Sequence, residues 1–295
     1  MRIDLHAHTI ASDGADSPRE LVAHALAANL DVLGLTDHDT TSGWSEAKDA
    51  ALGTGLRVLP GIELSCQVFD DEGSNPPRSI HLLGYLPDPT NPALTAEMDK
   101  IRHHRSDRLR LMVESLQSDY DITWEEVQAQ MPPGATAGRP HIAQVLIDKG
   151  FFADTTEAFQ GPLRADGPFH VPHYAPRLLE GIRLIAHAGG VPILAHPYTG
   201  ERSSAVHHQQ GFEEIRQAYQ ELAEAGLAGL EIDHRENTSE GKEVLRRVAA
   251  ELTLIATGSS DYHGTKKPNS LGENLTAPAQ LERILERASG HEVFS

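Results

Sequence analysis

Short apolar runs alternate with amphipathic helical patterns along most of this chain. Seven runs have the length and aliphatic composition of buried strands: Arg2–Leu5, Val32–Thr36, Arg57–Leu64, Ser79–Leu86, Val191–Ala195, Leu227–Ile232 and Leu252–Thr257. The helical patterns between them are Pro18–Ala28, Trp44–Gly53, Leu178–Gly189, Phe212–Ala225, Ser239–Ala250 and Ala279–Ala288. Ser17 is a suitable N-cap for the first helix, with Pro18 at its first position. Repeated strand–helix units predict parallel strands with helices outside. Seven strands rather than eight predict an incomplete α/β barrel, with its chemistry at the C-terminal strand ends.

One long segment interrupts this alternation. From about residue 87 to residue 176 the pattern is helical and irregular, with helices expected at Ala93–Leu116, Trp124–Met131, His141–Lys149 and Thr155–Phe159. We therefore predict that residues 1–86 and 177–295 form the barrel, and that residues 87–176 are an inserted helical subdomain beside its mouth. The polar stretch Asp70–Arg78 is rich in turn-forming residues and is expected to be an exposed loop between strands three and four.

Composition and charge exclude several classes of protein. The chain has 295 residues and a formal net charge of -18, which argues against a broad basic surface for long nucleic acid but permits a local cationic pocket. No apolar run approaches the roughly 20 residues of a membrane span, and the N-terminus lacks a signal-peptide pattern. The single cysteine, Cys66, precludes an internal disulfide and suits a reducing compartment. We expect a cytoplasmic protein without membrane contacts.

Side chains that can bind metal gather at the expected strand ends. His6 and His8 lie two residues apart at the end of the first strand, so both imidazoles project from the same face. Further candidates follow the other strands, and together they are His6, His8, Asp13, His38, Glu63, His81, His196, Asp261 and His263. Buried polar groups need partners, which shared metal ions would provide. The lack of clustered cysteines points to a catalytic centre with nitrogen and oxygen ligands rather than to structural zinc.

The motifs in these segments resemble those of the polymerase and histidinol phosphatase (PHP) superfamily. They are DLHAHTIASDG, GLTDHDT, GIE, a strand histidine, AHP and SDYH, in that order. The resemblance implies a distorted seven-stranded barrel that binds two or three divalent metal ions and hydrolyses phosphoesters. Two segments of the insertion, IRHHRSDR (101–108) and AGRPHIA (137–143), resemble a subgroup that removes the 3'-phosphate from nucleoside 3',5'-bisphosphates. Some members of that subgroup also trim short RNA from its 5' end.

The resemblance also implies three metal positions. The first would be held by His6, His8, Glu63 and Asp261, the second by the bridging Glu63 with His81 and His196, and the third by Asp13, His38 and His263. Many family members have histidine where this chain has Asp13, which keeps a ligand and adds a negative charge. Manganese is expected, with iron or zinc as alternatives, because all three tolerate mixtures of histidine and carboxylate. The nucleophile would be a hydroxide bridging the metals, held by the residues of the first position and His196.

A second anchor for the substrate is expected from the insertion. Arg102 and Arg105 are three residues apart on a predicted helix and share a face, so they could hold a second phosphate together. Alternatively, they pair with Glu97 and Asp99 on an exposed face. Arg139 and His141 could reach the same phosphate, or they could simply form the turn at a helix start. The expected substrate-binding set is Asp13, His38, Arg102, Arg105, Arg139 and His141.

Five other residues receive structural predictions. Asp37 is expected to orient a metal-binding imidazole rather than to bind metal itself. His187 lies in an apolar helical pattern and is expected in the core, and Cys66 is expected to be a small buried hydrophobe. Trp124 and Phe169 could stack on a base, although a lone aromatic side chain more often belongs to the core.

These observations predict a phosphoric monoester hydrolase. The expected reaction removes the 3'-phosphate of a nucleoside 3',5'-bisphosphate, for example converting adenosine 3',5'-bisphosphate into AMP and phosphate. The alternatives are a 5'-3' exoribonuclease acting on short RNA, a monoester phosphatase of the histidinol-phosphate type, and a non-catalytic nucleotide-sensing module. The expected partner is a small nucleotide, with short RNA as the alternative.

Overall fold

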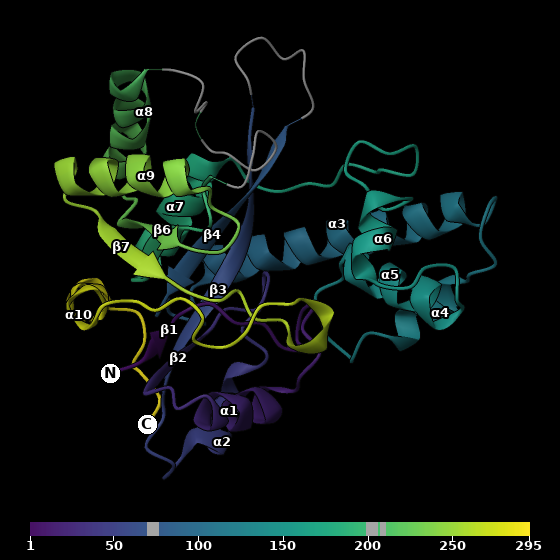
Figure 1. Cartoon of the computed structure of the whole chain (residues 1–295), viewed down its shortest axis with the longest axis horizontal. Helices are drawn as coiled ribbons and strands as arrows, with labels where there is room; N and C mark the ends of the chain where they lie inside the picture. The colour runs from purple at the N-terminus through teal and green to yellow at the C-terminus, as the bar shows by residue number, and fades with distance from the viewer. Residues whose placement is uncertain (70–76, 199–205, 207–210) are drawn as a thin grey trace.

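Seven strands form a single curved sheet at the centre of the molecule (Figure 1). The computed structural model describes residues 1–69, 77–198, 206 and 211–295. The strands are neighbours in chain order: β1 (Ile3–Asp4), β2 (Val32–Leu35), β3 (Arg57–Val68), β4 (Arg78–Tyr85), β5 (Val191–Leu194), β6 (Gly229–Asp233) and β7 (Ile255–Gly258). An isolated bridge between Ala7 and Tyr262 joins the segments after β1 and β7, which nearly closes the barrel. The expected α/β fold with a seven-stranded barrel is confirmed.

Strand direction differs from the prediction at β4. Four neighbouring pairs are parallel, but β4 runs antiparallel to both β3 and β5. Only residues 69–77 connect β3 to β4, and a parallel crossover needs about a dozen residues or more. The strands therefore pair as a hairpin, and the expectation of parallel strands throughout is wrong here. Most of the predicted loop Asp70–Arg78 lies outside the described residues, and Arg78 itself begins β4.

Six helices surround the sheet: α1 (Pro18–Ala27), α2 (Trp44–Ala51), α7 (Leu178–His187), α8 (Phe212–Glu224), α9 (Ser239–Glu251) and α10 (Pro278–Arg287). Ser17 caps α1 through a reciprocal capping box with Glu20. In α7 the buried stripe contains Leu178, Ile182 and Ile185, whereas His187 is exposed. The prediction that His187 belongs to the core is therefore wrong, because its position falls outside that stripe. Cys66 is fully buried, as expected.

The insertion consists of the long helix α3 (Pro92–Leu116) and the shorter helices α4 (Trp124–Ala129), α5 (Arg139–Asp148) and α6 (Thr155–Gln160). Figure 1 shows the three short helices gathered around the far end of α3, away from the barrel. The first half of α3 packs into the core between the sheet and its outer helices, through Leu94, Met98 and Ile101. Its second half packs into a separate core with α4, α5 and α6, and Trp124 and Phe169 contact that second core. The boundaries at residues 87 and 176 stay a prediction.

The described chain has two further features that bear on its organisation. Phe294 pairs with Val58 on β3, so the C-terminus returns to the barrel near the N-terminus (Figure 1). Within the described residues, no helix combines the length and the apolar character needed to cross a bilayer.

Candidate metal centre

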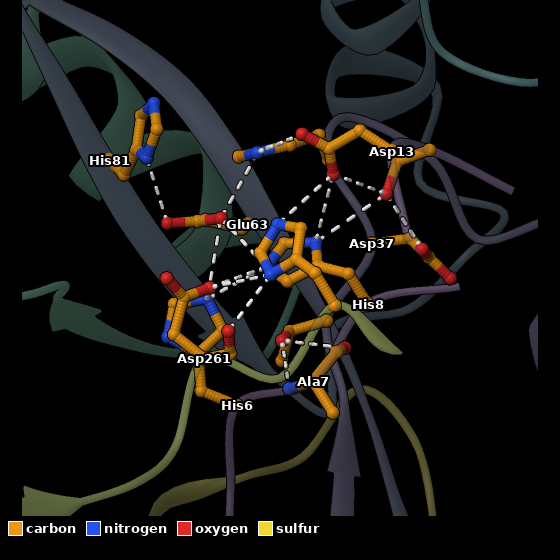
Figure 2. Close-up of polar contacts among 12 residues, drawn as sticks. His6, Ala7, His8, Asp13, Asp37, Glu63, His81 and Asp261 are labelled. Atoms are coloured by element: carbon orange, nitrogen blue, oxygen red, sulfur yellow. Dashed lines mark hydrogen bonds and ion pairs between the residues drawn. The ribbon is translucent and has the colours of Figure 1, made fainter. Parts of the chain in front are cut away.

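The segment after β1 supplies two neighbouring imidazoles. His6 and His8 are fully buried, and their Nε2 atoms lie 3.0 Å apart. Ala7, between them, donates its backbone N–H to Thr36 and forms the bridge to Tyr262, which fixes the local backbone as an extended strand. Alternate side chains of an extended strand point to the same side. His6 and His8 consequently face the same point at the barrel mouth, as the sequence predicted (Figure 2).

Glu63, in the middle of β3, lies at the centre of this cluster and is almost completely buried. Its Oε2 atom faces three imidazole nitrogens, at 3.3 Å from His6, 3.2 Å from His8 and 3.1 Å from His38. Its Oε1 atom faces two others, at 2.9 Å from His81 and 3.2 Å from His196. The two carboxylate oxygens thus contact different groups of histidines. This is the arrangement required of a carboxylate shared between two metal ions.

The described residues contain three overlapping sets of potential ligand atoms, each with all its atoms within 4.8 Å of one another. The sets are His6, His8, Glu63 and Asp261; His8, Asp13, His38 and His263; and His38, Glu63 and His81. The first set matches the first position implied by the sequence, and the second contains the whole of the third position with His8 added. The third contains Glu63 and His81 of the expected second position, with His38 in place of His196.

All nine predicted ligand residues therefore meet at one place, and this donor set suits divalent ions. Their assignment as metal ligands stays a proposal.

Charge compensation within the cluster is extensive. Burial alone would raise the pKa of Glu63, but the neighbouring His81, His38 and His6 imidazoles hold that pKa well below its usual range. Burial likewise opposes ionisation of Asp261, yet Lys267 and His263 hold its pKa low. A metal-free cluster of this kind holds protons on some of its imidazoles. A metal ion that bound there would displace them.

His8 is the clearest example of an imidazole that holds a proton in the metal-free cluster. Burial disfavours its charged form, but Asp261 and Glu63 raise its pKa to about 9.

Three residues that the sequence analysis did not select support the predicted ligands. Glu231, on β6, places Oε1 2.9 Å from His6 Nδ1. Lys267 donates to Asp261 Oδ2 at 2.7 Å, and His234 Nε2 lies 3.8 Å from the same oxygen. The signal that could have revealed Glu231 is its place in GLEID, where an acidic residue interrupts a buried apolar strand.

Asp37 is connected to the predicted ligand His8 through another residue. Its Oδ1 atom accepts hydrogen bonds from the Thr9 backbone N–H and the Ser12 hydroxyl, both at 2.7 Å. Ser12 Oγ in turn lies 3.4 Å from His8 Nδ1. Asp37 thus organises the loop that carries His8, and it makes no direct contact with a predicted ligand imidazole among the contacts of the described residues.

Arg105 connects the insertion to the barrel directly behind the cluster. Its Nη1 atom lies 3.0 Å from Asp39 Oδ2 and donates to Ser65 Oγ at 2.7 Å, while Nε donates to the Ala137 carbonyl at 2.9 Å. Asp39 is fully buried. The Arg105 guanidinium is therefore engaged by protein groups on three sides.

The other residues expected to bind substrate differ in their surroundings. Arg102 pairs with Asp99, which was the alternative interpretation, and donates to a backbone carbonyl of the barrel at 3.3 Å. His141 is buried and bonds through Nδ1 to the Gly138 N–H, at the start of α5. Arg139 donates to the Leu163 carbonyl at 2.9 Å and lines a cavity. Their role in substrate binding stays a prediction.

The cavity next to the cluster has a volume of about 480 Å³, within the usual range for small-molecule sites. Its lining includes His81 and His196 from the barrel and Arg108, Arg139, Asp166 and His173 from the insertion. Arg108 was not among the residues expected from the sequence, and its Nη1 lies 3.3 Å from His173 Nδ1.

Burial and the nearby Arg139 lower the pKa of Arg108 to about 9, so it is still charged at neutral pH. Within the described residues, neither Arg108 nor Arg139 has a carboxylate within ion-pair distance. We call these two arginines the cationic wall of the cavity.

Comparisons with known proteins agree with this geometry. The family model described as "PHP domain" matches residues 4–151. The 3',5'-nucleoside bisphosphate phosphatase of Chromobacterium violaceum is 30% identical over 268 residues, which cover 88% of this chain and 87% of that protein. The 5'-3' exoribonuclease Rnm of Escherichia coli is 27% identical over 283 residues, or 95% of this chain and 92% of that protein.

Among solved structures, a protein of Bifidobacterium adolescentis assigned as a metal-dependent phosphoesterase is 36% identical. It superposes with a TM-score of 0.88, covering 97% of this chain and 96% of that one. With its barrel, its His/carboxylate cluster and these relatives, the chain belongs to the PHP family of metal-dependent phosphoesterases.

Proposed function

We propose that this protein hydrolyses the 3'-phosphate of nucleoside 3',5'-bisphosphates, releasing phosphate and a nucleoside 5'-monophosphate. The observation that carries the proposal is the cavity, because it joins the predicted metal ligands His81 and His196 to the cationic wall of Arg108 and Arg139. A small molecule with two phosphates needs two anion-binding regions a short distance apart. Both kinds of residue line this one cavity.

The nine clustered residues would hold two or three divalent ions, with manganese favoured over iron or zinc. When bound, the ions would supply an activated water molecule and neutralise phosphate oxygens. Glu63 would be shared between positions, because each of its oxygens faces a different group of histidines. His81 and His196 line the cavity, so the phosphate to be cleaved would lie on their side of it.

The cationic wall would hold the 5'-phosphate. Arginine guanidiniums bind phosphate through paired hydrogen bonds, and no carboxylate of the described residues lies within ion-pair distance of Arg108 or Arg139. Their positive charge is local, in a chain whose formal net charge is -18. A dianionic phosphate would therefore be attracted to the cavity rather than to the protein surface in general. The named activity of the Chromobacterium violaceum relative supports this substrate class.

The second candidate is a 5'-3' exoribonuclease acting on short RNA, which the Escherichia coli relative favours. The same cationic wall would then hold the 5'-phosphate of the RNA, and the same cluster would act on the next phosphodiester. Both candidates need the same two anion-binding regions, so they are separated by their products.

The test is phosphate release from a substrate panel by metal-stripped protein to which manganese, iron or zinc is added back. The panel contains a nucleoside 3',5'-bisphosphate, the matching 3'-monophosphate, an aryl phosphate and a short 5'-phosphorylated oligoribonucleotide. We expect the highest kcat/KM with the bisphosphate and one free phosphate per molecule. Release of mononucleotides from the oligoribonucleotide at a higher kcat/KM would favour the exoribonuclease. No turnover with any substrate and metal would contradict both, and a Glu63→Gln preparation controls for contaminating phosphatases.

A further inference from the structure

Strand β6 contributes none of the nine clustered residues, yet Glu231 in its middle is fully buried directly behind them. Its Oε1 atom lies 2.9 Å from His6 Nδ1 and accepts a hydrogen bond from the Ser259 hydroxyl. Its Oε2 atom accepts the backbone N–H of His196 at 2.8 Å. One carboxylate therefore contacts segments that follow β1, β5 and β7.

The contact with His6 determines which ring nitrogen can bind metal. His6 turns Nδ1 to Glu231 and Nε2 to the cluster, where Nε2 lies 3.3 Å from Glu63 Oε2 and 3.4 Å from Asp261 Oδ1. An ionised carboxylate only accepts hydrogen bonds, so the proton of a neutral His6 is held on Nδ1. The lone pair is then on Nε2, the nitrogen that faces the predicted metal position.

The contact with His196 acts on the backbone. His196 has a φ of 30°, which is an uncommon conformation for a residue other than glycine. In this conformation its Nε2 atom lies 3.2 Å from Glu63 Oε1, so the unusual backbone delivers the imidazole to the cluster. Glu231 holds that backbone through the His196 N–H.

We propose that Glu231 is a positioning residue that prepares the centre for metal by fixing the His6 tautomer and the His196 backbone together. His6 and His196 face different oxygens of Glu63, and both would depend on the buried carboxylate of Glu231 for their placement. The inference rests on the proposed metal centre but not on the identity of the substrate. It concerns metal binding, which can be measured without turnover.

The substitution Glu231→Gln tests the inference because an amide has one acceptor and one donor end. If the amide oxygen accepts the His196 N–H, the NH2 group faces His6 Nδ1 and favours the tautomer with the proton on Nε2. If the amide is turned round, the NH2 group faces the His196 N–H and that hydrogen bond is lost. Either orientation removes one of the two effects, and we expect metal affinity to fall roughly 10- to 100-fold.

A matched control is Asp233→Asn, which removes the same charge from the same strand. The Asp233 side chain is 45% exposed and pairs with Arg246, away from the cluster. We expect its metal affinity to equal that of the unsubstituted protein. Affinity and stoichiometry for manganese and zinc would be measured by calorimetry and chelator competition. Histidine ¹⁵N NMR of the zinc-bound proteins would report which ring nitrogen of His6 carries the proton, and thermal unfolding would confirm folding.

Unchanged metal affinity in folded Glu231→Gln protein would overturn the inference and leave the proposed function standing. If that variant does not fold, Glu231→Asp keeps the charge but shortens the side chain by one methylene, so it cannot reach both His6 and His196. A weaker metal affinity is expected there too, and a value equal to the unsubstituted protein would overturn the inference. An unsubstituted protein that bound no divalent metal would contradict the proposed function as well.

Discussion

The substitution Arg108→Ala should reduce activity selectively on substrates that carry a 5'-phosphate. The Arg108 guanidinium lines the cavity and remains charged at neutral pH. Within the described structure, its side-chain neighbour at hydrogen-bond distance is His173. A hydrogen bond to a charged group contributes about 1.5–3 kcal/mol. Since about 1.4 kcal/mol corresponds to a factor of ten, kcat/KM for the bisphosphate should fall roughly ten- to a hundredfold.

The assay compares kcat/KM for a nucleoside 3',5'-bisphosphate and for the 3'-monophosphate that lacks the 5'-phosphate. Arg110→Ala is the matched control, since Arg110 lies on the same helix, is exposed and pairs with Glu114 at 3.2 Å. Arg108→Ala should lose efficiency on the bisphosphate alone. Equal losses on both substrates would mean that Arg108 supports the insertion, and no loss on either would remove the cationic wall from the phosphate site.

Arg105→Ala provides a contrast within the same helix. Arg105 is bound to Asp39, Ser65 and the Ala137 carbonyl, so its loss should disturb the barrel loop behind the cluster. We expect similar losses on both substrates and a lower melting temperature. A loss confined to the bisphosphate would instead support the original prediction that Arg105 contacts phosphate.

Four further predictions concern the metal centre. Glu63→Gln should lower the metal content by more than one ion per chain and abolish turnover, and elemental analysis showing full occupancy with near-normal activity would contradict its bridging role. Asp13→Ala should reduce kcat while leaving the first two metals bound, so unchanged kinetics would exclude Asp13 from the centre. Because the pKa of His8 is raised from 6.5 to about 9, metal binding at neutral pH should release protons and strengthen as pH rises towards 9. Calorimetry in buffers of different ionisation enthalpy counts those protons, and none released would contradict the pKa. In the metal-free protein, the contribution of His8 to stability should be complete below pH 6.5 and lost as pH rises through about 9, which denaturant unfolding would measure.

The parts of the fold that follow from local pattern were predictable. Each of the seven apolar runs is a strand, and Ser17 caps the first helix as its sequence indicates. The direction of β4 was harder to predict, because an apolar run of this kind has the same pattern in a parallel and in an antiparallel strand. The reversal places His81 opposite Ser65 on β3, and so beside Glu63. Only the short connection between the two strands pointed to a hairpin.

Site residues were easier to predict when their residue type and position are unusual in this chain than when many similar residues occur. His6 and His8 stand out at a strand end, whereas Glu231 is one acidic residue among many in an acidic chain. For the arginines, helical spacing places both Arg102 and Arg108 three residues from Arg105, so spacing alone cannot separate them. The three arginines differ in whether the fold places a carboxylate beside the guanidinium. Arg102 pairs with Asp99 and Arg105 pairs with Asp39. The described structure places no carboxylate within ion-pair distance of Arg108.

Helix α3 belongs to two hydrophobic cores at once, and this limits which substrates can be accommodated. At about 1.5 Å per residue, its 25 residues form a rod of about 37 Å that is anchored in the barrel at one end and in the insertion at the other. Arg108 lies between the two anchors, so its backbone cannot approach or leave the predicted metal ligands without bending a continuous helix. In the proposed reaction, the separation between the two phosphates of the substrate would therefore be set by a rigid element. An enzyme that selects substrates by the distance between their two phosphates would not distinguish between bases. Purine and pyrimidine nucleotides with the same phosphate positions should then be hydrolysed with similar kcat/KM.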